Sequence, residues 1–423
     1  MRIVLPLKLL TVVLAVAVVA PVSAQEERLG RTVESLLDYA RSNNPEYATM
    51  RHEADAAAER VMPAGALPDP KFRIELMDIT KMGEQNATLS PNRVGSTKYT
   101  ITQELPWYGK RDLKREIAEL DAEGAQGRSR GAWSEINARL KAAHAQLYLL
   151  HRNEQLTREI LDLMVRLEKV AQVRYAGGLA MQQDAIRAQV EQTAMRNDLI
   201  MLESEGNMLR ARVNMLLARP ANALLAKPEA LRPIPAPAKL DYVALEDRVR
   251  SRNPRLFAED AAIKSAEKKR DLAYKERYPD FMVGVTPVQY QNSVKEWQLM
   301  VEFNIPLQQS SRRSMERESE SMLSAARARK EATANQVLSE LAENLSGIEA
   351  ARRTEMLATT SLLPQAELTF NSALAAYENG KVDFVTLIEA QQQIRKARLN
   401  QIKAQAEAQV RLAEIERLLG EEL

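Results

Sequence analysis

Few side chains in this sequence have a type and spacing suited to chemistry. The chain has 423 residues, with three histidines and no cysteine, which excludes disulfides, cysteine nucleophiles and thiolate metal sites. His144 and His151 are seven residues apart on one helical face and could form a weak metal site, but packing is the favoured interpretation. His52 stands alone, and no glycine-rich phosphate loop occurs. The sequence therefore predicts no catalytic site, no resident metal and no cofactor, so we do not expect an enzyme.

Methionine offers a second kind of ligand, because its thioether sulfur is soft enough to contact copper or silver ions. The candidates are Met77, Met82, Met181 and Met208. They are scattered along the chain, which favours the filling of gaps between packed helices over a metal site.

The N-terminus has the pattern of a secretory signal. Residues 1–24 combine a basic start, an apolar run and a final stretch of small residues, which predicts a cleaved signal peptide. A retained membrane anchor is the alternative, but the apolar run is shorter than the roughly 20 residues that a spanning helix needs. Removal of Arg2 and Lys8 cancels the formal charge of +2, so no basic excess is left to suggest nucleic-acid binding.

The two halves of the chain resemble each other at a spacing of about 200 residues. Five landmarks recur in the same order: Ser42–Pro45 with Ser251–Pro254, Leu67–Asp69 with Tyr278–Asp280, Gln103–Pro106 with Phe303–Pro306, Tyr175–Gly178 with Tyr377–Gly380, and Leu216–Leu217 with Leu418–Leu419. Between the halves, the stretch from Pro220 to Pro237 is too rich in proline for a helix or a central strand. We therefore predict a first repeat at 25–219, a connector at 220–240 and a second repeat at 241–423. The shared order of elements favours one pseudo-symmetric body over two domains on a flexible linker.

Each repeat is expected to begin with a short helix and two strands. Asn44 and Asn253 each precede a proline, a pattern that suits a helix N-cap followed by its first turn. Segments of alternating apolar and polar residues follow at 72–76, 98–105, 281–285 and 297–305. Such strands could form a small soluble sheet or the wall of a membrane barrel. Four strands cannot close a barrel, and open strand edges cannot exist in lipid, so a barrel would need strands from several chains.

Aromatic residues mark the ends of these strands. Trp107, Tyr108 and Trp297 are expected to be interfacial anchors, since tryptophan and tyrosine are enriched where a membrane meets water. The segment from Lys81 to Gly95 would be an external loop, and Gln289 to Val294 a tighter one.

Long helices are expected to fill the rest of each repeat. From Arg111 to Ala176 no proline interrupts a helix-forming composition, which allows a rod of about 100 Å. The second repeat has a counterpart from Ser311 to Tyr377 and a returning helix from Asp383 to Leu419. Apolar residues at three-and-four spacing form narrow seams along these helices. The polar remainder of the surface would face solvent or line a water-filled tunnel.

The order of a helix, two strands and a long helical hairpin, repeated once, resembles the TolC family of outer-membrane factors over the whole mature chain. The segments Tyr175–Ala180 and Tyr377–Val382, each followed by Ile-x-Ala-Gln, are similar to the hairpin tips of that family. The resemblance implies a mainly α fold with a small β part. It also implies a homotrimer in the outer membrane lipid, with four strands per protomer in a shared twelve-stranded barrel and a helical tunnel that extends into the periplasm.

The resemblance further implies a function without catalysis. Such a protein is the passive exit duct of a tripartite efflux system, and its partners are a periplasmic adaptor and an inner-membrane pump of the resistance-nodulation-division type. The stretch Gly95–Lys110, with Leu67–Pro70, looks most like the branch that serves heavy-metal pumps. Alternative cargoes are drugs or a secreted polypeptide. A periplasmic coiled-coil scaffold without a barrel is the alternative from a different class.

The resemblance also assigns roles at the hairpin tips. Gly178, Leu179, Gly380 and Lys381 match the tip residues that meet the adaptor.

For the periplasmic gate, Asp184 and Tyr377 match a linked tyrosine–carboxylate pair, and Glu389 matches a carboxylate of an acidic ring. Thr386 departs from the other ring acid, and Val382 departs from an arginine that braces neighbouring protomers.

Overall fold

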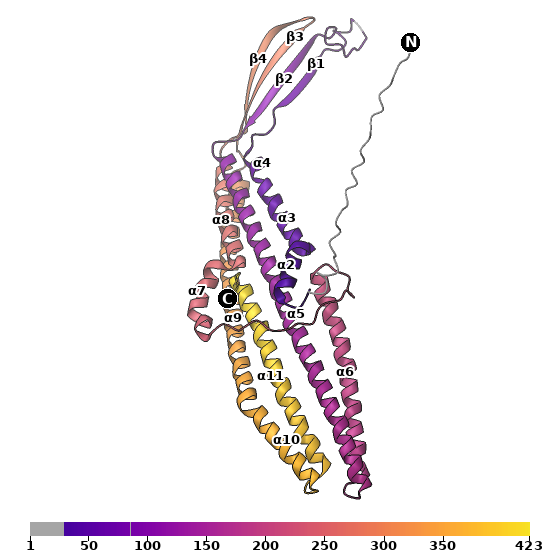
Figure 1. The fold of residues 1–423 in the computed structure, drawn as a ribbon. Coiled ribbons are helices and arrows are strands. Elements are labelled where there is room, and N and C mark those ends of the chain that lie inside the picture. The colour runs from indigo at the N-terminus through magenta and orange to yellow at the C-terminus, as the bar shows by residue number, and fades with distance from the viewer. Residues whose placement is uncertain (1–28, 85) are drawn as a thin grey trace, which may run out of the picture.

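The computed structural model describes residues 29–84 and 86–423 of the chain. The signal peptide expected at residues 1–24 lies outside the described residues. The molecule is elongated, with a four-stranded sheet at one end, two long helical hairpins at the other, and shorter helices packed around the middle (Figure 1). Within the described ranges, no helix is both long enough and apolar enough to cross a membrane.

The first repeat contains three helices before its strands, where the sequence predicted one. They are α2 (Val33–Asn43), α3 (Pro45–Glu59) and α4 (Val61–Gly65). The strands are β1 (Lys71–Met77) and β2 (Ser96–Leu105), and the long helices are α5 (Lys110–Ala176) and α6 (Gln182–Leu216). Helix α5 runs without a break for 67 residues, about 100 Å at 1.5 Å per residue. We call α5 and α6 the first hairpin.

The second repeat has the same order with one change. After the short turn η1 (Pro237–Leu240), it contains α7 (Tyr242–Arg252), α8 (Pro254–Lys275), β3 (Phe281–Tyr290) and β4 (Ser293–Phe303). Its descending rod consists of α9 (Gln309–Leu357), the π-helical segment η2 (Ala358–Leu362) and α10 (Leu363–Glu378), and α11 (Phe384–Leu419) returns. We call α9, η2, α10 and α11 the second hairpin. The rod expected to run unbroken from Ser311 to Tyr377 is therefore interrupted.

The interruption has a local cause. Pro364 is the second residue of α10 and lacks the N–H that would continue the regular bonding pattern. The N–H of Leu363 bonds instead to the carbonyl of Ala358, five residues earlier. A wider turn of this kind takes up extra residues inside a helix. The second rod does have two more residues than the first between matching landmarks, since Pro306 and Gly380 are 74 apart whereas Pro106 and Gly178 are 72 apart.

The strands form one antiparallel sheet in the order β1-β2-β3-β4, with open edges at β1 and β4. Its register places Phe72 beside Ile101, Ile101 beside Val285, and Val285 beside Leu299. The next row has Arg73 beside Thr100 and Thr286 beside Gln298, and the two threonine hydroxyls are 2.9 Å apart. Because side chains alternate between faces, one face of the sheet is apolar and exposed and the other is polar.

Two buried asparagines fasten the repeats near the middle of the molecule. The Asn44 amide donates to the carbonyl of Leu216 at 2.7 Å, and its oxygen accepts from the N–H of Tyr47. Asn253 donates to the carbonyl of Leu418 at 2.7 Å, and its oxygen accepts from two N–H groups at the start of α8. Each side chain therefore caps the start of one helix and the end of the returning hairpin helix at once.

Three apolar clusters stabilise the helices. One lies between the two hairpins toward their tips and includes Met164, Met195 and Leu387. The other two lie near the middle, where α2 packs on the first hairpin and α7 on the second. Each fully buried side chain of this size contributes about 1.5–3 kcal/mol. The clusters follow the three-and-four seams that the sequence predicted.

Candidate functional site

The tips of the two hairpins lie together at the end of the molecule farthest from the sheet (Figure 1). Both turns have the same backbone geometry. The N–H of Leu179 bonds to the carbonyl of Arg174, and the N–H of Lys381 bonds to the carbonyl of Ala376, each five residues back. Such a helix ending needs a residue with positive φ. Gly178 and Gly380 supply it with φ of 69° and 70°.

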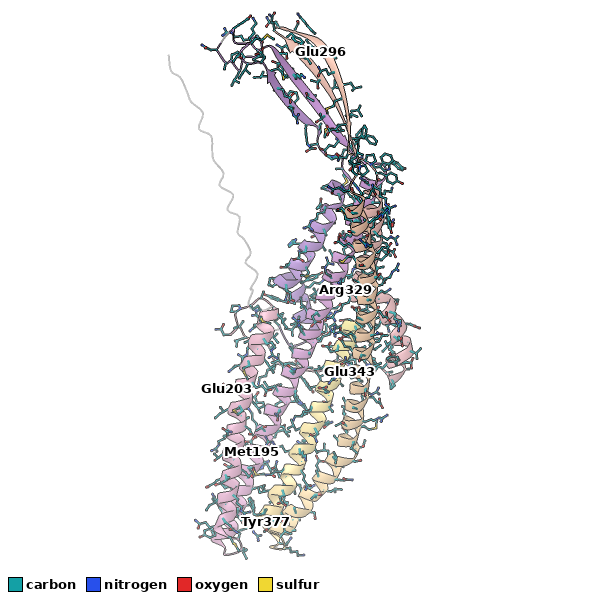
Figure 2. The ribbon with its side chains drawn as sticks, turned by 180° about the vertical axis from the view of Figure 1, so that it is seen from behind. Met195, Glu203, Glu296, Arg329, Glu343 and Tyr377 are labelled. Carbon is teal, nitrogen blue, oxygen red and sulfur yellow. The ribbon has the colours of Figure 1, made fainter. Side chains whose placement is uncertain are left out.

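Asp184 and Tyr377 meet at these tips although they are 193 residues apart. The Tyr377 hydroxyl donates to Oδ2 of Asp184 at 3.3 Å, and both side chains are buried, at 2% and 9% exposure. Figure 2 shows Tyr377 at the opposite end of the molecule from Glu296 in the sheet. The ring of Phe384 packs edge-on against Tyr377 at 5.3 Å.

Burial and the Asp184 carboxylate together raise the pKa of Tyr377 to about 12. Burial is the larger cause, because it disfavours the charged phenolate. The phenol therefore stays protonated at neutral pH and acts as a hydrogen-bond donor to the carboxylate.

Arg174 also contacts this pair, and sequence reasoning did not identify it. Its guanidinium lies 4.9 Å from the centre of the Tyr377 ring. It donates to the carbonyl of Leu179 at 3.2 Å and to the carbonyl of Glu378. Helix α5 ends two residues later, and a basic residue in the last turn of a helix is common. Nothing in the sequence therefore distinguished Arg174 from an ordinary helix end.

The remaining gate candidates lie on or before the first turns of α11. The Thr386 hydroxyl bonds to Oδ1 of Asp383 at 2.7 Å, and its N–H bonds to the same oxygen at 3.1 Å. Thr386 is thus part of a helix cap. Glu389 is exposed, and Val382 packs against the apolar cluster between the hairpins. The structure brings Asp184 and Tyr377 together but does not bring Glu389 or Thr386 into that contact.

The four residues expected to meet an adaptor are open at the tips. Leu179 has 69% of its surface exposed. Lys381 is exposed. A Cβ added at Gly178 would meet no atom within 4 Å, so the space around this glycine is free for a partner.

The three aromatic residues expected to be anchors lie near opposite ends of the sheet. Trp297 is 71% exposed on the apolar face of β4, four residues beyond the start of that strand. Trp107 follows β2, and its ring stacks on Tyr278 at 5.1 Å. Tyr108 is almost fully exposed beside it.

The candidate metal ligands are not brought into a cluster. Within the described part of the chain, no group of three or more histidine, aspartate or glutamate side chains is placed to hold a metal ion. His144 is buried, and burial lowers the pKa of its imidazole. Met77 is in β1 and Met82 in the loop after it, whereas Met181 is at a hairpin tip and Met208 is on α6.

The chain is similar in sequence to known proteins. A family model described as "outer membrane efflux protein" matches residues 36–218 and 245–421. The chain is 24% identical over 409 residues to the cobalt-zinc-cadmium resistance protein CzcC of Cupriavidus metallidurans, covering 95% of this chain and 92% of that protein.

Solved structures share the fold at lower identity. The outer-membrane channel OprN superposes with a TM-score of 0.78 at 19% identity, covering 94% of this chain and 91% of that one. CusC superposes with a TM-score of 0.79 at 14% identity and covers 92% of each chain.

Proposed function

Because the chain belongs to the outer membrane efflux protein family, we propose that it is the exit duct of a tripartite system that exports heavy-metal cations. It is an outer membrane efflux channel that extends into the periplasm, and it is not an enzyme. The proposal of a metal cargo rests on the match to a cobalt-zinc-cadmium resistance protein along 95% of the chain. Multidrug export and polypeptide secretion are the competing cargoes. Family membership disfavours a scaffold without a barrel.

We propose a homotrimer on two grounds from the structure. The sheet has unpaired edges at β1 and β4, and its outer face is apolar. In lipid those backbone groups need partners, so three copies of four strands would close a twelve-stranded barrel.

The second ground is a stripe on α6. Five of its exposed apolar side chains fall on one side of the helix, since their spacings of 4, 11, 7 and 7 residues are close to whole helical turns. They are Ile186, Val190, Met201, Met208 and Met215. Within one chain, α5 of the first repeat packs against α11 of the second. In the two repeats, α9 and α10 correspond to α5, and α6 corresponds to α11. The same contact between copies would therefore place α9 and α10 of one protomer against the α6 stripe of the next. Such head-to-tail contacts form a ring when the rotation between copies closes.

At the periplasmic end, the contact between Asp184 and Tyr377 is proposed as the gate. It ties the start of α6 to the end of α10 inside one protomer, and opening would require the hydrogen bond to break. Glu389, with its exposed carboxylate, is proposed to line the pore near the contact and attract cations. Thr386 is proposed to occupy a position in the ring of side chains around the pore, where it contributes no charge.

The tips are proposed as the docking site for a periplasmic adaptor that connects the duct to a pump of the resistance-nodulation-division type. Gly178, Leu179, Gly380 and Lys381 would make this contact. Trp107, Tyr108 and Trp297 are proposed to sit at the two lipid–water interfaces of the barrel.

Growth assays test the cargo. Deletion of the gene should lower tolerance to cobalt, zinc or cadmium, and the wild-type chain should restore it. Unchanged metal tolerance together with reduced tolerance to organic toxicants would overturn the metal assignment and favour multidrug export.

A pair of variants tests the trimer. Met208→Lys puts a charge in the α6 stripe and should abolish heat-resistant trimers extracted in detergent from the outer membrane. Glu203→Lys, also exposed on α6 but away from the stripe, is the control and should leave trimers intact. Trimers of equal heat resistance from both variants would refute the proposed packing.

A further inference from the structure

We propose that Arg174 is a clasp that joins the two hairpin tips of one protomer and holds Tyr377 in position for Asp184. The proposal rests on the gate proposed above and adds a positioning residue to it. Arg174 does not line the pore in this proposal. It acts through the ring of Tyr377 and the backbone on either side of the gate.

The contacts of Arg174 span both tips. One guanidinium nitrogen, Nη1, bonds to the carbonyl of Glu378, and the other, Nη2, bonds to the carbonyl of Leu179 at 3.2 Å. Glu378 is the last residue of α10, whereas Leu179 belongs to the turn of the first hairpin. A single side chain therefore bridges backbone that is about 200 residues apart in sequence.

The same guanidinium lies over the Tyr377 ring at 4.9 Å from its centre. A cation over an aromatic face is attracted by the ring electrons, so this contact restrains the ring whose hydroxyl reaches Asp184. Phe384 also packs against the ring. Tyr377 is thus restrained by two side chains, of which only Arg174 comes from the opposite hairpin.

Electrostatics favour this position for a cation. The carbonyl of Glu378 is one of the last carbonyls of α10, which have no partner within their own helix. The C-terminal end of a helix carries partial negative charge. A guanidinium there satisfies a free acceptor and lies against the favourable end of the helix dipole.

The two tips are not equivalent in the side chains that they offer. Val382 is apolar and packs in the cluster between the hairpins, so it cannot hydrogen-bond across the tips. The repeat counterpart of Arg174 is Ala376, given that Tyr175 matches Tyr377. The clasp therefore comes only from the first hairpin and closes on the second.

The geometry also requires arginine rather than any basic residue. A planar guanidinium can donate to two carbonyls while stacking on a ring, whereas a lysine ammonium is a point charge on a flexible stem. Lysine at this position should restore part of the attraction to the Tyr377 ring but not both hydrogen bonds to the backbone carbonyls.

Ion conductance of the purified full-length mature trimer in planar lipid bilayers tests the clasp. Arg174→Ala should raise the open fraction by about tenfold or more, because hydrogen bonds to charged groups typically contribute that much to an equilibrium. Arg174→Lys should fall between this variant and wild type. Arg166→Ala removes an exposed arginine about two turns earlier on α5 and should behave as wild type. Heat-resistant trimers from all variants would show that assembly is intact.

A double-mutant cycle separates positioning from general loosening. If Arg174 acts partly through the ring, Arg174→Ala should have a smaller effect in the Tyr377→Ala background than in wild type, since the ring contact is already absent there and only the two backbone hydrogen bonds are left to lose. Fully additive effects would overturn the proposal.

The failure of the clasp can also be told from the failure of the gate. If Arg174→Ala stays as closed as Arg166→Ala while Tyr377→Phe opens the channel, the gate stands and the clasp is wrong. If Tyr377→Phe and Asp184→Asn also leave conductance unchanged, the gate is wrong and the clasp with it.

Discussion

Replacing Tyr377 by phenylalanine removes one oxygen from the candidate gate and leaves the rest of it in place. The ring can still lie under Arg174 and against Phe384. What is lost is the hydrogen bond to Asp184, which is 3.3 Å long and buried. Hydrogen bonds to charged groups contribute about 1.5–3 kcal/mol, and the length of this one favours the lower figure. We therefore expect the closed state to lose about 1.5 kcal/mol per protomer.

The effect on the pore depends on how the protomers open. If one protomer can open alone, 1.5 kcal/mol raises the open fraction about tenfold. If three protomers must open together, their contributions add to about 4.5 kcal/mol, or about a thousandfold. The size of the change therefore reports whether opening is concerted.

Single-channel recording of the reconstituted trimer gives the open fraction directly. Tyr175→Phe is the matched control, because Tyr175 is the counterpart of Tyr377 in the first repeat, is 49% exposed, and should leave conductance unchanged. Equal conductance of the two variants would refute the gate assignment.

The pH dependence of the wild type gives a second check on the same reasoning. An ordinary tyrosine has a pKa near 10, and the buried Tyr377 has a pKa of about 12. Because the raised pKa belongs to the closed state, the contribution of the phenol to closure is complete below about pH 10 and is lost as pH rises through about 12. The open fraction should therefore stay constant between about pH 7 and pH 10, and a rise within that window would show that another group controls closure.

Four further substitutions test the fold that supports the gate. Asn253→Ala removes a buried amide that caps two helices at once and should destabilise the protein by about 2–3 kcal/mol, measured as a lower unfolding temperature. Gly127→Ala should destabilise by about 1–3 kcal/mol, because its Cβ would approach an aromatic ring of α8 to 2.9 Å, whereas Gly131→Ala, with its nearest atom at 3.7 Å, should stabilise by up to about 1 kcal/mol. Burial acts to raise the pKa of Glu416, but hydrogen bonds from Arg232 at 3.0 Å and from Lys141 at 2.8 Å outweigh it and hold the pKa below its ordinary value. The stability it contributes is therefore present above that ordinary value of 4.5 and lost as pH falls below it, and Glu416→Gln should remove this acid sensitivity in urea unfolding curves.

The sheet could be predicted from sequence because its signal is local. In β4, Trp297, Leu299 and Val301 occupy alternate positions with Gln298 and Met300 between them, and in the structure all three lie exposed on one face. Alternation follows directly from the extended backbone. Which chains pair at the open edges is not encoded in that pattern.

The short helices α2 and α7 were missed for a physical reason. The Asn-Pro signal was interpreted as the beginning of the first helix in each repeat. In the structure Asn44 ends α2 and begins α3, and Asn253 does the same for α7 and α8. A single residue that serves as both C-cap and N-cap hides the helix before it.

At the tips, sequence and structure contribute different residues. The resemblance of the tip motifs singled out Asp184 and Tyr377, and the structure places them in contact. Their role in gating stays a prediction. Arg174 was missed because its acceptors are backbone carbonyls of Leu179 and Glu378, and a carbonyl is the same in every residue type. Only the folded arrangement could bring it to notice.

The paired asparagines also bear on how long such a duct can be. Asn44 and Asn253 close each repeat near the middle of the molecule, and past α2 and α7 only the two hairpins continue to the tips (Figure 1). Adding seven residues to both arms of each hairpin would move the tips about 10 Å farther from the membrane while the sheet and the asparagine caps stay as they are. The reach of the duct across the periplasm is then set by helix length alone, and one scaffold can serve cell envelopes of different depth.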